Sequence, residues 1–208
     1  DLINKGVSLM CFFGHASGSG FDISIDNPDA YNNTNGKYPL LIANSCFVGN
    51  IHQPASVSNS EEWVLHPRGD IGFLASVDLG IASSLNVYTS EVYKNIGQKR
   101  YGQSIGKIIQ ETVKAIQSAS LKNTCLLMTL HGDPAIVLNT HSLPDYTITV
   151  SDVYTEPPEV TTDVDSFKLK MIITNIGRAI NTDLLVWVTR KYPVESNFTD
   201  TTYSVIFP

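Results

Sequence analysis

The sequence predicts an α/β domain with a mostly parallel sheet, followed by an all-β module. Three near-continuous apolar runs at 6–13, 38–43 and 70–77 do not alternate in polarity. Such runs suit strands that are buried on both faces of a parallel sheet. Apolar residues in 104–119 recur at helical spacing, which predicts a helix packed on that sheet. Beyond about residue 141 the chain changes to short alternating runs, a pattern typical of a β-sandwich.

The remaining elements of the first part follow from local signals. Residues 59–65 and 89–98 read as helices, and we expect Ser60 to cap the first because acidic residues follow it in the first turn. The apolar pieces at 125–130 and 135–138 flank a turn that begins at His131.

The second part contains four alternating segments that predict strands. They are 146–151, 167–174, 184–189 and 202–207. Residues rich in Pro, Gly and Asn separate them, as turns require. We therefore expect two domains, residues 1–142 and residues 143–208.

Composition excludes several classes of function. The chain has 208 residues and a net charge of −6, so it lacks the basic face that nucleic-acid binding requires. No run of eighteen apolar residues predicts a membrane span. The spacing of the three cysteines matches no metal site, and we expect neither a metal nor a cofactor. Cys11 and Cys125 lie in apolar runs and are expected to be buried, whereas Cys46 is not.

Two potentially reactive residues follow two of the predicted strands. His15 comes after the first apolar run, and Cys46 comes after the second. If these strands are parallel neighbours, the imidazole and the thiol leave the same edge of the sheet, where α/β proteins bind ligands. A neighbouring imidazole activates a thiol nucleophile and then protonates the leaving amine. The pattern favours a Cys–His pair, with a core cysteine and a core histidine as the structural alternative.

The residues around this pair predict further parts of a site. The segment 14–20 is rich in small residues, which leaves room for a substrate and frees amides to face an oxyanion. We place the oxyanion donors at the amides of Ala16 and Cys46. Four further residues are expected to line the substrate site, with Asp78 a possible receptor for a basic P1 side chain. They are Gly14, Ser45, Ser76 and Asp78.

Several sequence blocks, taken together, resemble those of the gingipain-like cysteine peptidases, the caspase-like peptidase family C25. Residues 13–21 and 40–50 are similar to the histidine and cysteine blocks of that family. Residues 69–76 look like its next core strand, and residues 130–135 look like its closing Gly-Asp-Pro turn. The segment 174–193 resembles the immunoglobulin-like module that often follows the catalytic domain in such proteins.

The resemblance implies a caspase-like fold and an endopeptidase that cleaves protein or peptide substrates through an acyl-enzyme. It assigns the nucleophile to Cys46 and the general acid/base to His15. It also implies export to the bacterial cell surface or beyond, and a partner in the N-terminal half of the family's catalytic domain. The chain departs from the family at Ala16, where glycine is usual.

Two alternatives stay open. One is a non-catalytic scaffold or binding protein of the cell envelope on the same fold, which the departure at Ala16 favours. The other is a processing peptidase or transpeptidase, whose residues would be the same.

Among the other histidines, we expect His131 to be a turn residue and the remaining three to be solvated. Asp133 is expected to fix the turn before Pro134 by accepting hydrogen bonds from nearby amides. The three solvated histidines are His52, His66 and His141.

Overall fold

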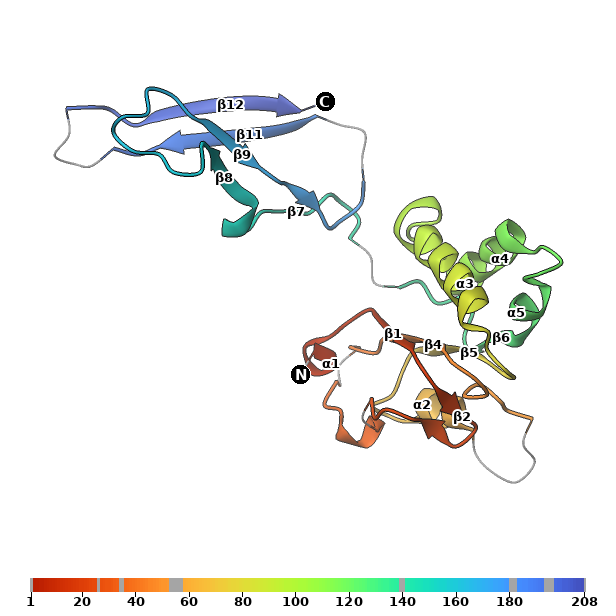
Figure 1. The fold of residues 1–208 in the computed structure, drawn as a ribbon. Helices are drawn as coiled ribbons and strands as arrows, with labels where there is room; N and C mark the ends of the chain where they lie inside the picture. Colours follow the sequence, from red (N-terminus) through yellow and green to blue (C-terminus); the bar gives the residue numbers. More distant parts are fainter. Residues whose placement is uncertain are drawn as a thin grey trace. The chain divides into compact units, whose positions relative to one another are not determined.

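The computed structural model describes most of the chain (Figure 1). The described residues are 2–25, 27–33, 36–52, 58–138, 141–179, 183–192 and 197–207. The chain divides into two compact units, residues 1–140 and residues 141–208. Each unit is described by itself below.

A four-stranded sheet forms the centre of the first unit (Figure 1). Strands β1 (Leu9–Phe13), β4 (Leu40–Asn44) and β5 (Gly72–Ser76) are parallel neighbours in that order. Strand β6 (Met128–Gly132) pairs with β5 in the antiparallel direction. The mostly parallel sheet that the apolar runs predict is therefore confirmed.

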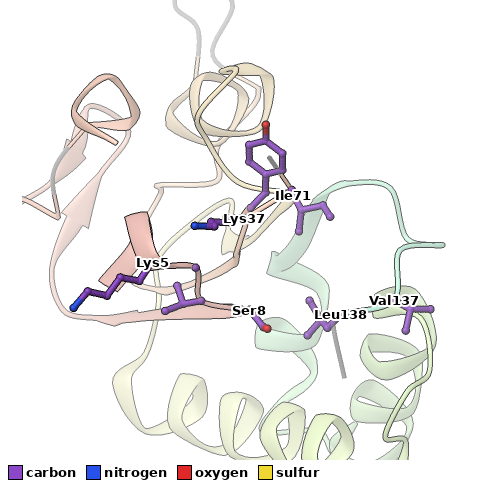
Figure 2. Close-up of a pocket in the computed structure, with 10 residues that line it drawn as sticks. Lys5, Ser8, Lys37, Ile71, Val137 and Leu138 are labelled. Atoms are coloured by element: carbon purple, nitrogen blue, oxygen red, sulfur yellow. The ribbon is translucent and has the colours of Figure 1, made fainter. Parts of the chain in front are cut away.

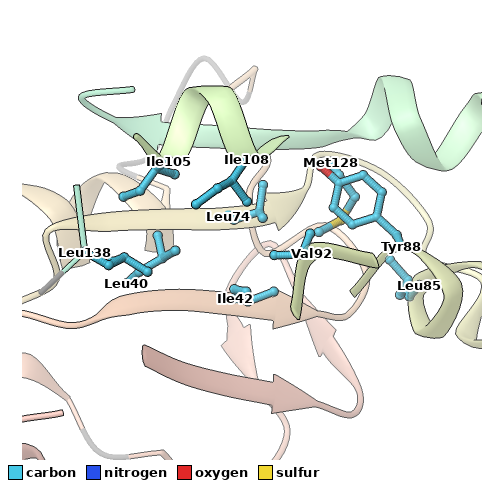
Figure 3. Close-up of a cluster of buried hydrophobic side chains, with 10 residues drawn as sticks. All are labelled: Leu40, Ile42, Leu74, Leu85, Tyr88, Val92, Ile105, Ile108, Met128 and Leu138. Carbon is cyan, nitrogen blue, oxygen red and sulfur yellow. The ribbon is translucent and has the colours of Figure 1, made fainter. Parts of the chain in front are cut away.

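Helices cover this sheet on both faces (Figure 1). Successive side chains of a strand point to opposite faces, so each strand contributes to two cores. Leu40, Ile42 and Leu74 pack against helices α3 (Ala82–Lys94) and α4 (Ile105–Ile116), as Figure 3 shows. On the other face, four strand residues pack against Trp63 of helix α2 (Asn59–Leu65) and against Tyr31. The four are Leu41, Ala43, Phe73 and Ala75.

Shorter elements complete the unit. They are α1 (Leu2–Lys5), β2 (Ala16–Ser17), β3 (Gly20–Phe21), the 3₁₀ turn η1 (Pro28–Ala30), the π-helical turn η2 (Asn95–Lys99) and α5 (Lys122–Leu127).

The helix boundaries correct three of the sequence expectations. Ser58, not Ser60, caps α2, and its hydroxyl and Glu61 form a reciprocal capping box. Helix α3 begins at Ala82 rather than at Thr89, because Leu85 packs into the core and extends the helix toward its N-terminus. The apolar piece at 125–130 is divided between α5 and β6, with Met128 the first residue of the strand.

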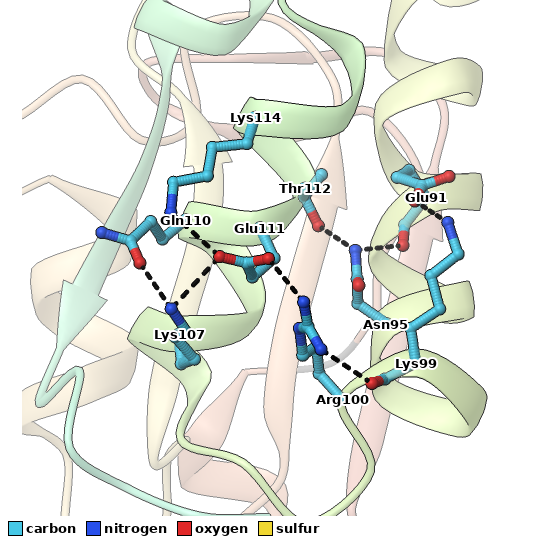
Figure 4. A network of polar contacts seen from close by, with 9 residues as sticks. All are labelled: Glu91, Asn95, Lys99, Arg100, Lys107, Gln110, Glu111, Thr112 and Lys114. Atoms are coloured by element: carbon cyan, nitrogen blue, oxygen red, sulfur yellow. Dashed lines mark hydrogen bonds and ion pairs between the residues drawn. The ribbon is translucent and has the colours of Figure 1, made fainter.

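A network of charged and polar side chains joins α3, η2 and α4 (Figure 4). Lys99 donates to the Glu91 carboxylate at 2.6 Å. Between the helices, the side-chain amide of Asn95 donates to the hydroxyl of buried Thr112 at 3.1 Å. Around Glu111, three cations lie within 2.8 to 3.1 Å of its carboxylate oxygens: Arg100, Lys107 and Lys114. The network therefore links the two helices that pack on this face of the sheet.

The described part of the second unit consists of three two-stranded antiparallel sheets. The pairs are β7 (Tyr146–Thr147) with β10 (Thr174–Asn175), β8 (Val153–Glu156) with β9 (Lys168–Met171), and β11 (Leu184–Arg190) with β12 (Thr201–Phe207). The segment 146–151 is not one strand, because a 3₁₀ turn, η3 (Val150–Asp152), interrupts it. The unit is all-β in its described residues, while an immunoglobulin-like arrangement stays a prediction.

Candidate active site

Two neighbouring strand ends bring His15 and Cys46 to one pocket. Strand β1 ends at Phe13 and the parallel strand β4 ends at Asn44, so both residues leave the same edge of the sheet. The pocket has a volume of about 170 Å³. Its lining residues are Phe13, Gly14, His15, Asn44, Ser45, Cys46, Gly80, Ala82 and Leu85. His15 is exposed and Cys46 is half-buried, so both are open to a substrate.

The Cys46 sulfur faces the backbone of Gly80. The amide of Gly80 donates to the sulfur at 3.3 Å, and the sulfur lies 3.8 Å from the Gly80 carbonyl oxygen. This close approach requires glycine, because a β-carbon at position 80 would lie 2.6 Å from Leu85 and 2.9 Å from the Ser45 carbonyl oxygen. An N–H that donates to the sulfur stabilises the negative charge of a thiolate at this position.

A tight turn follows Cys46 and is held by the loop after β5. Phe47 adopts a left-handed backbone with φ of 57°, and its amide donates to the Asp78 carbonyl oxygen at 3.0 Å. Gly49 donates in the same way to the carbonyl oxygen of Ser76 at 3.0 Å. The strained position is therefore maintained by surrounding contacts, as is common at functional sites.

The four predicted substrate-site residues fall into two groups. Gly14 and Ser45 line the pocket, whereas Ser76 and Asp78 are not among its lining residues. The Ser76 hydroxyl donates to the Asp78 carbonyl oxygen at 2.8 Å, which braces the loop that holds the turn after Cys46. The Asp78 carboxylate accepts from the amide of Leu79 at 2.7 Å. A role for Ser76 and Asp78 in substrate binding stays a prediction.

The backbone at Ala16 is ordinary. Phe47 is the single non-glycine residue with a positive φ in the part of the chain that the structure describes, so Ala16 does not need the freedom of glycine. Ala16 pairs with Phe21 in a short antiparallel ladder, next to a hydrogen bond from Asp22 to His15. Because bonded and non-bonded pairs alternate in such a ladder, the Ala16 amide points away from β3. Ala16 is not among the residues that line the pocket at Cys46, so its role as an oxyanion donor stays a prediction.

Sequence reasoning missed Asn44 as a residue of the site. Asn44 is the last residue of β4, is 1% exposed and lines the pocket. Its side-chain amide donates to the Phe12 carbonyl oxygen at 3.3 Å, and its side-chain oxygen accepts from the Thr89 hydroxyl. A polar residue that ends an otherwise apolar strand was the available signal, since such a residue needs buried partners.

The other cysteines do not share this setting. Cys11 is exposed, so the expectation that it is buried was wrong; it lies on β1, one of the two edge strands of the sheet. Cys125 is half-buried, and burial raises the pKa of its thiol. Only Cys46 among the three lines the pocket with a histidine.

The remaining histidines lie in varied surroundings. His131 is in strand β6 opposite Phe73, not in the turn, and burial lowers the pKa of its ring. His66 is not simply solvated, because its ring nitrogen contacts the Asp29 carboxylate at 3.0 Å. The expected turn role of Asp133 is confirmed, since its carboxylate accepts from the amide of Ala135 at 2.8 Å.

A larger pocket lies at the opposite ends of the parallel strands (Figure 2). It has a volume of about 550 Å³. Ser8, Tyr38 and Ile71 line it, and each directly precedes a parallel strand or lies close before it. These are the amino ends of the strands, whereas ligands of α/β sheets bind at the carboxyl ends. The smaller pocket at Cys46 is therefore the better candidate site.

Two searches of the described residues complete this description. They contain no group of three or more acidic, histidine or cysteine side chains placed to hold a metal ion. Nor do they contain a helix with the length and apolar character of a membrane span.

An α/β sheet that brings a cysteine and a histidine to one pocket has the arrangement of a cysteine peptidase. The model of peptidase family C25 matches residues 1–139, and the chain belongs to this family. A comparison with curated proteins found no match.

Solved structures show the same fold at low sequence identity. The Arg-specific cysteine proteinase gingipain R (RGPB) superimposes with a TM-score of 0.58 at 16% identity, over 74% of this chain and 40% of that one. The complex of Porphyromonas gingivalis RgpB pro- and mature domains gives the same score and identity, over 74% and 41%. A further protease matches with a TM-score of 0.58 at 11% identity, over 99% of this chain and 55% of that one. The chain thus spans about two fifths of the gingipain R chains that it matches.

Proposed function

We propose that this protein is a cysteine endopeptidase that hydrolyses peptide bonds of protein substrates. The observation that carries the proposal is that His15 and Cys46 line one open pocket at the carboxyl edge of a parallel sheet. Membership of peptidase family C25 supports the same reaction class.

The proposed reaction uses His15 and Cys46, which line this pocket, and two backbone amides. His15 takes the proton of the Cys46 thiol, and the sulfur attacks the carbonyl carbon of the scissile bond. The amides of Ala16 and Cys46 donate to the oxyanion that forms. His15 then gives its proton to the leaving amine, which departs and leaves a thioester on Cys46. Water, activated by His15, attacks the thioester, releases the acid and restores the thiol.

The finer parts of the proposal rest on the family resemblance. We propose that the protein acts at the bacterial cell surface or outside the cell, as the resemblance implies. Residues 143–208 are proposed to be an immunoglobulin-like module, and the β-strands among the described residues of this part support the proposal. The proposed partner of the first unit is an N-terminal half of the catalytic domain such as these peptidases possess.

Alkylation by iodoacetamide tests whether His15 activates Cys46. The rate at each cysteine is measured by mass spectrometry across a range of pH, in the wild type, in His15→Ala and in the matched control His52→Ala. We expect Cys46 to react faster than exposed Cys11 near neutral pH, and His15→Ala to slow it roughly tenfold or more. His52 is exposed and lies outside the pocket, so its variant should behave as the wild type does.

If Cys46 reacts no faster than Cys11, and His15→Ala changes nothing, the peptidase proposal fails for this chain. The scaffold alternative would then be favoured. Where Cys46 is activated, cleavage of a denatured protein with and without an added primary amine distinguishes the hydrolase from a transpeptidase. A transpeptidase joins the amine to the new C-terminus, whereas a hydrolase leaves a free acid.

A further inference from the structure

Both the NH₂ group and the oxygen of the Asn44 side chain contact neighbouring residues beside the pocket. The NH₂ group donates to the Phe12 carbonyl oxygen at 3.3 Å and lies 3.4 Å from the Cys11 sulfur. The side-chain oxygen accepts from the hydroxyl of Thr89, which is itself buried in α3. An Asn side chain offers two donors and one acceptor oxygen, and all are occupied here. A fully satisfied buried amide holds one orientation.

These contacts join the three segments that form the pocket. Phe12 lies three residues before His15, on the strand that delivers the imidazole. Asn44 itself lies two residues before Cys46, on the strand that delivers the thiol. Thr89 belongs to α3, whose first turns contribute Ala82 and Leu85 to the pocket wall. The backbone adds a fourth tie, because Gly14 donates to the Asn44 carbonyl oxygen at 3.3 Å.

We infer that Asn44 is a positioning residue that sets the His15 segment against the Cys46 segment, with Thr89 as the group that orients it. This inference rests on the proposed function of the pair. Asn44 does not act on the substrate. It fixes the strand ends from which the two reacting side chains extend, and small errors in such placement cost large factors in rate.

The chain offers a matched pair of variants for a test. Thr89→Val removes the hydroxyl that orients Asn44 and keeps the shape of the side chain. Thr112→Val makes the same change in a second buried Thr–Asn pair, where Thr112 contacts Asn95 away from the pocket. Thr89→Val leaves the Asn44 side-chain oxygen without its donor, whereas Thr112→Val leaves the Asn95 side-chain NH₂ with the Glu91 carbonyl oxygen as its acceptor. Each change removes one buried hydrogen bond, so both are expected to lower the unfolding midpoint. Thr89→Ser restores the hydroxyl.

The readout is the alkylation rate of Cys46 against pH in the full chain, with and without His15→Ala. We expect Thr89→Val to reduce the His15-dependent part of the rate roughly tenfold, and to change its pH profile. Thr112→Val should leave that part of the rate within roughly twofold of the wild type, and Thr89→Ser should recover most of it. Asn44→Asp should act as Thr89→Val does, because a carboxylate cannot donate to the Phe12 carbonyl oxygen.

The possible failures are distinguishable. If the wild type shows no His15-dependent reactivity at Cys46, the proposed function fails, and the positioning role fails with it. If the wild type shows that reactivity and Thr89→Val retains it, the proposed function stands and the positioning role is wrong. Equal losses in Thr89→Val and Thr112→Val would indicate general destabilisation and would also overturn the inference.

Discussion

The two units of this chain differ in how they use apolar strands. In the first unit, every residue of β4 and β5 is buried, and Phe73 is 0% exposed. In the second unit, no described residue is buried, and Trp187 on β11 is 66% exposed. Both units contain runs of β-branched and aromatic residues, so composition alone does not separate them.

The difference lies in what covers the strands. Helices lie on both faces of the first sheet, and each face has its own core of buried residues. The described part of the second unit has only two-stranded sheets, which bury little surface and are marginal by themselves. A site that needs fixed geometry is therefore expected in the first unit, where the packing holds strand ends in place.

Removing one large side chain from each unit should reveal this difference most strongly. Phe73→Ala empties a site between the rings of Phe21 and Trp63, and we expect it to lower the free energy of unfolding of the first unit by about 3–5 kcal/mol. Val188→Ala in β11 removes a half-buried side chain and should cost the second unit about 1 kcal/mol or less.

The chain has two tryptophans, one in each unit, so fluorescence can follow each unfolding separately. Urea titrations in a Trp187→Phe background follow Trp63 in the first unit, and titrations in a Trp63→Phe background follow the second. Equal losses for the two alanine variants would show that the second unit has a closed core and would remove the contrast.

A buried carboxyl should give the first unit a distinctive dependence on pH. Asp70 is 5% exposed, neither of its carboxyl oxygens has a hydrogen-bond partner in the described structure, and burial raises its pKa to about 8. In the unfolded chain an aspartate ionises near pH 4. Between roughly pH 4 and pH 8 the folded state therefore binds the extra proton, and stability falls as the pH rises.

Asp70→Asn removes this titration. We expect the variant to match the wild type near pH 4 and to exceed it near pH 8 by several kcal/mol, at most about 5 kcal/mol, in urea titrations that follow Trp63. An advantage that does not change between the two pH values would show that Asp70 is not neutral in the folded protein.

The smallest expected effects come from removing one ion-paired carboxylate in each unit. Arg100, Lys114 and Lys107 lower the pKa of the Glu111 carboxyl to about 2. A lowered folded pKa stabilises the protein above the unfolded value near 4, and this contribution is lost as the pH falls toward 2. Glu111→Gln should thus lower the melting temperature at pH 7 slightly and leave it unchanged near pH 2.

The matched change in the second unit is Glu156→Gln, which removes one cross-strand pair with Lys170 at 2.7 Å. Its effect at pH 7 should be smaller still, because it removes one cation contact rather than three. Added salt should reduce both effects. A larger loss for Glu156→Gln would mean that this one ion pair stabilises the second unit more than the three contacts of Glu111 stabilise the first.

Much of the first unit could be predicted from the sequence, because local patterns determine it. The apolar runs around Cys11, Ile42 and Leu74 gave the parallel strands and the order of His15 and Cys46 along one sheet edge. Properties that depend on where a strand lies within the sheet could not be predicted from local sequence patterns. Cys11 lies in an apolar run but is exposed, because β1 is an edge strand, and no local pattern reports which strand has a free edge.

The polar side chain of Asn44 at the end of an apolar strand was a signal, but its partners could not be predicted for a similar reason. Its partners Phe12 and Thr89 lie 32 and 45 residues away, so the contacts exist only after the sheet and α3 have packed. The helix α3 itself began earlier than expected, because packing of Leu85 against the sheet outweighed weak local propensity. Chain-distant contacts of this kind determine the fine geometry of the site and leave no trace in sequence periodicity.

The hydrogen bond from the Gly80 amide to the Cys46 sulfur has a practical consequence for anyone who wishes to trap a bound substrate. Replacing the cysteine by alanine would leave that amide directed at a methyl group, and the loop would lose one of its hydrogen bonds to the segment that follows β4. A serine keeps an acceptor atom at the same place while being a far weaker nucleophile. If Cys46 is the nucleophile, as proposed, Cys46→Ser is therefore the least reactive form that keeps a contact for the Gly80 amide, and crystals of peptide complexes should be attempted with it.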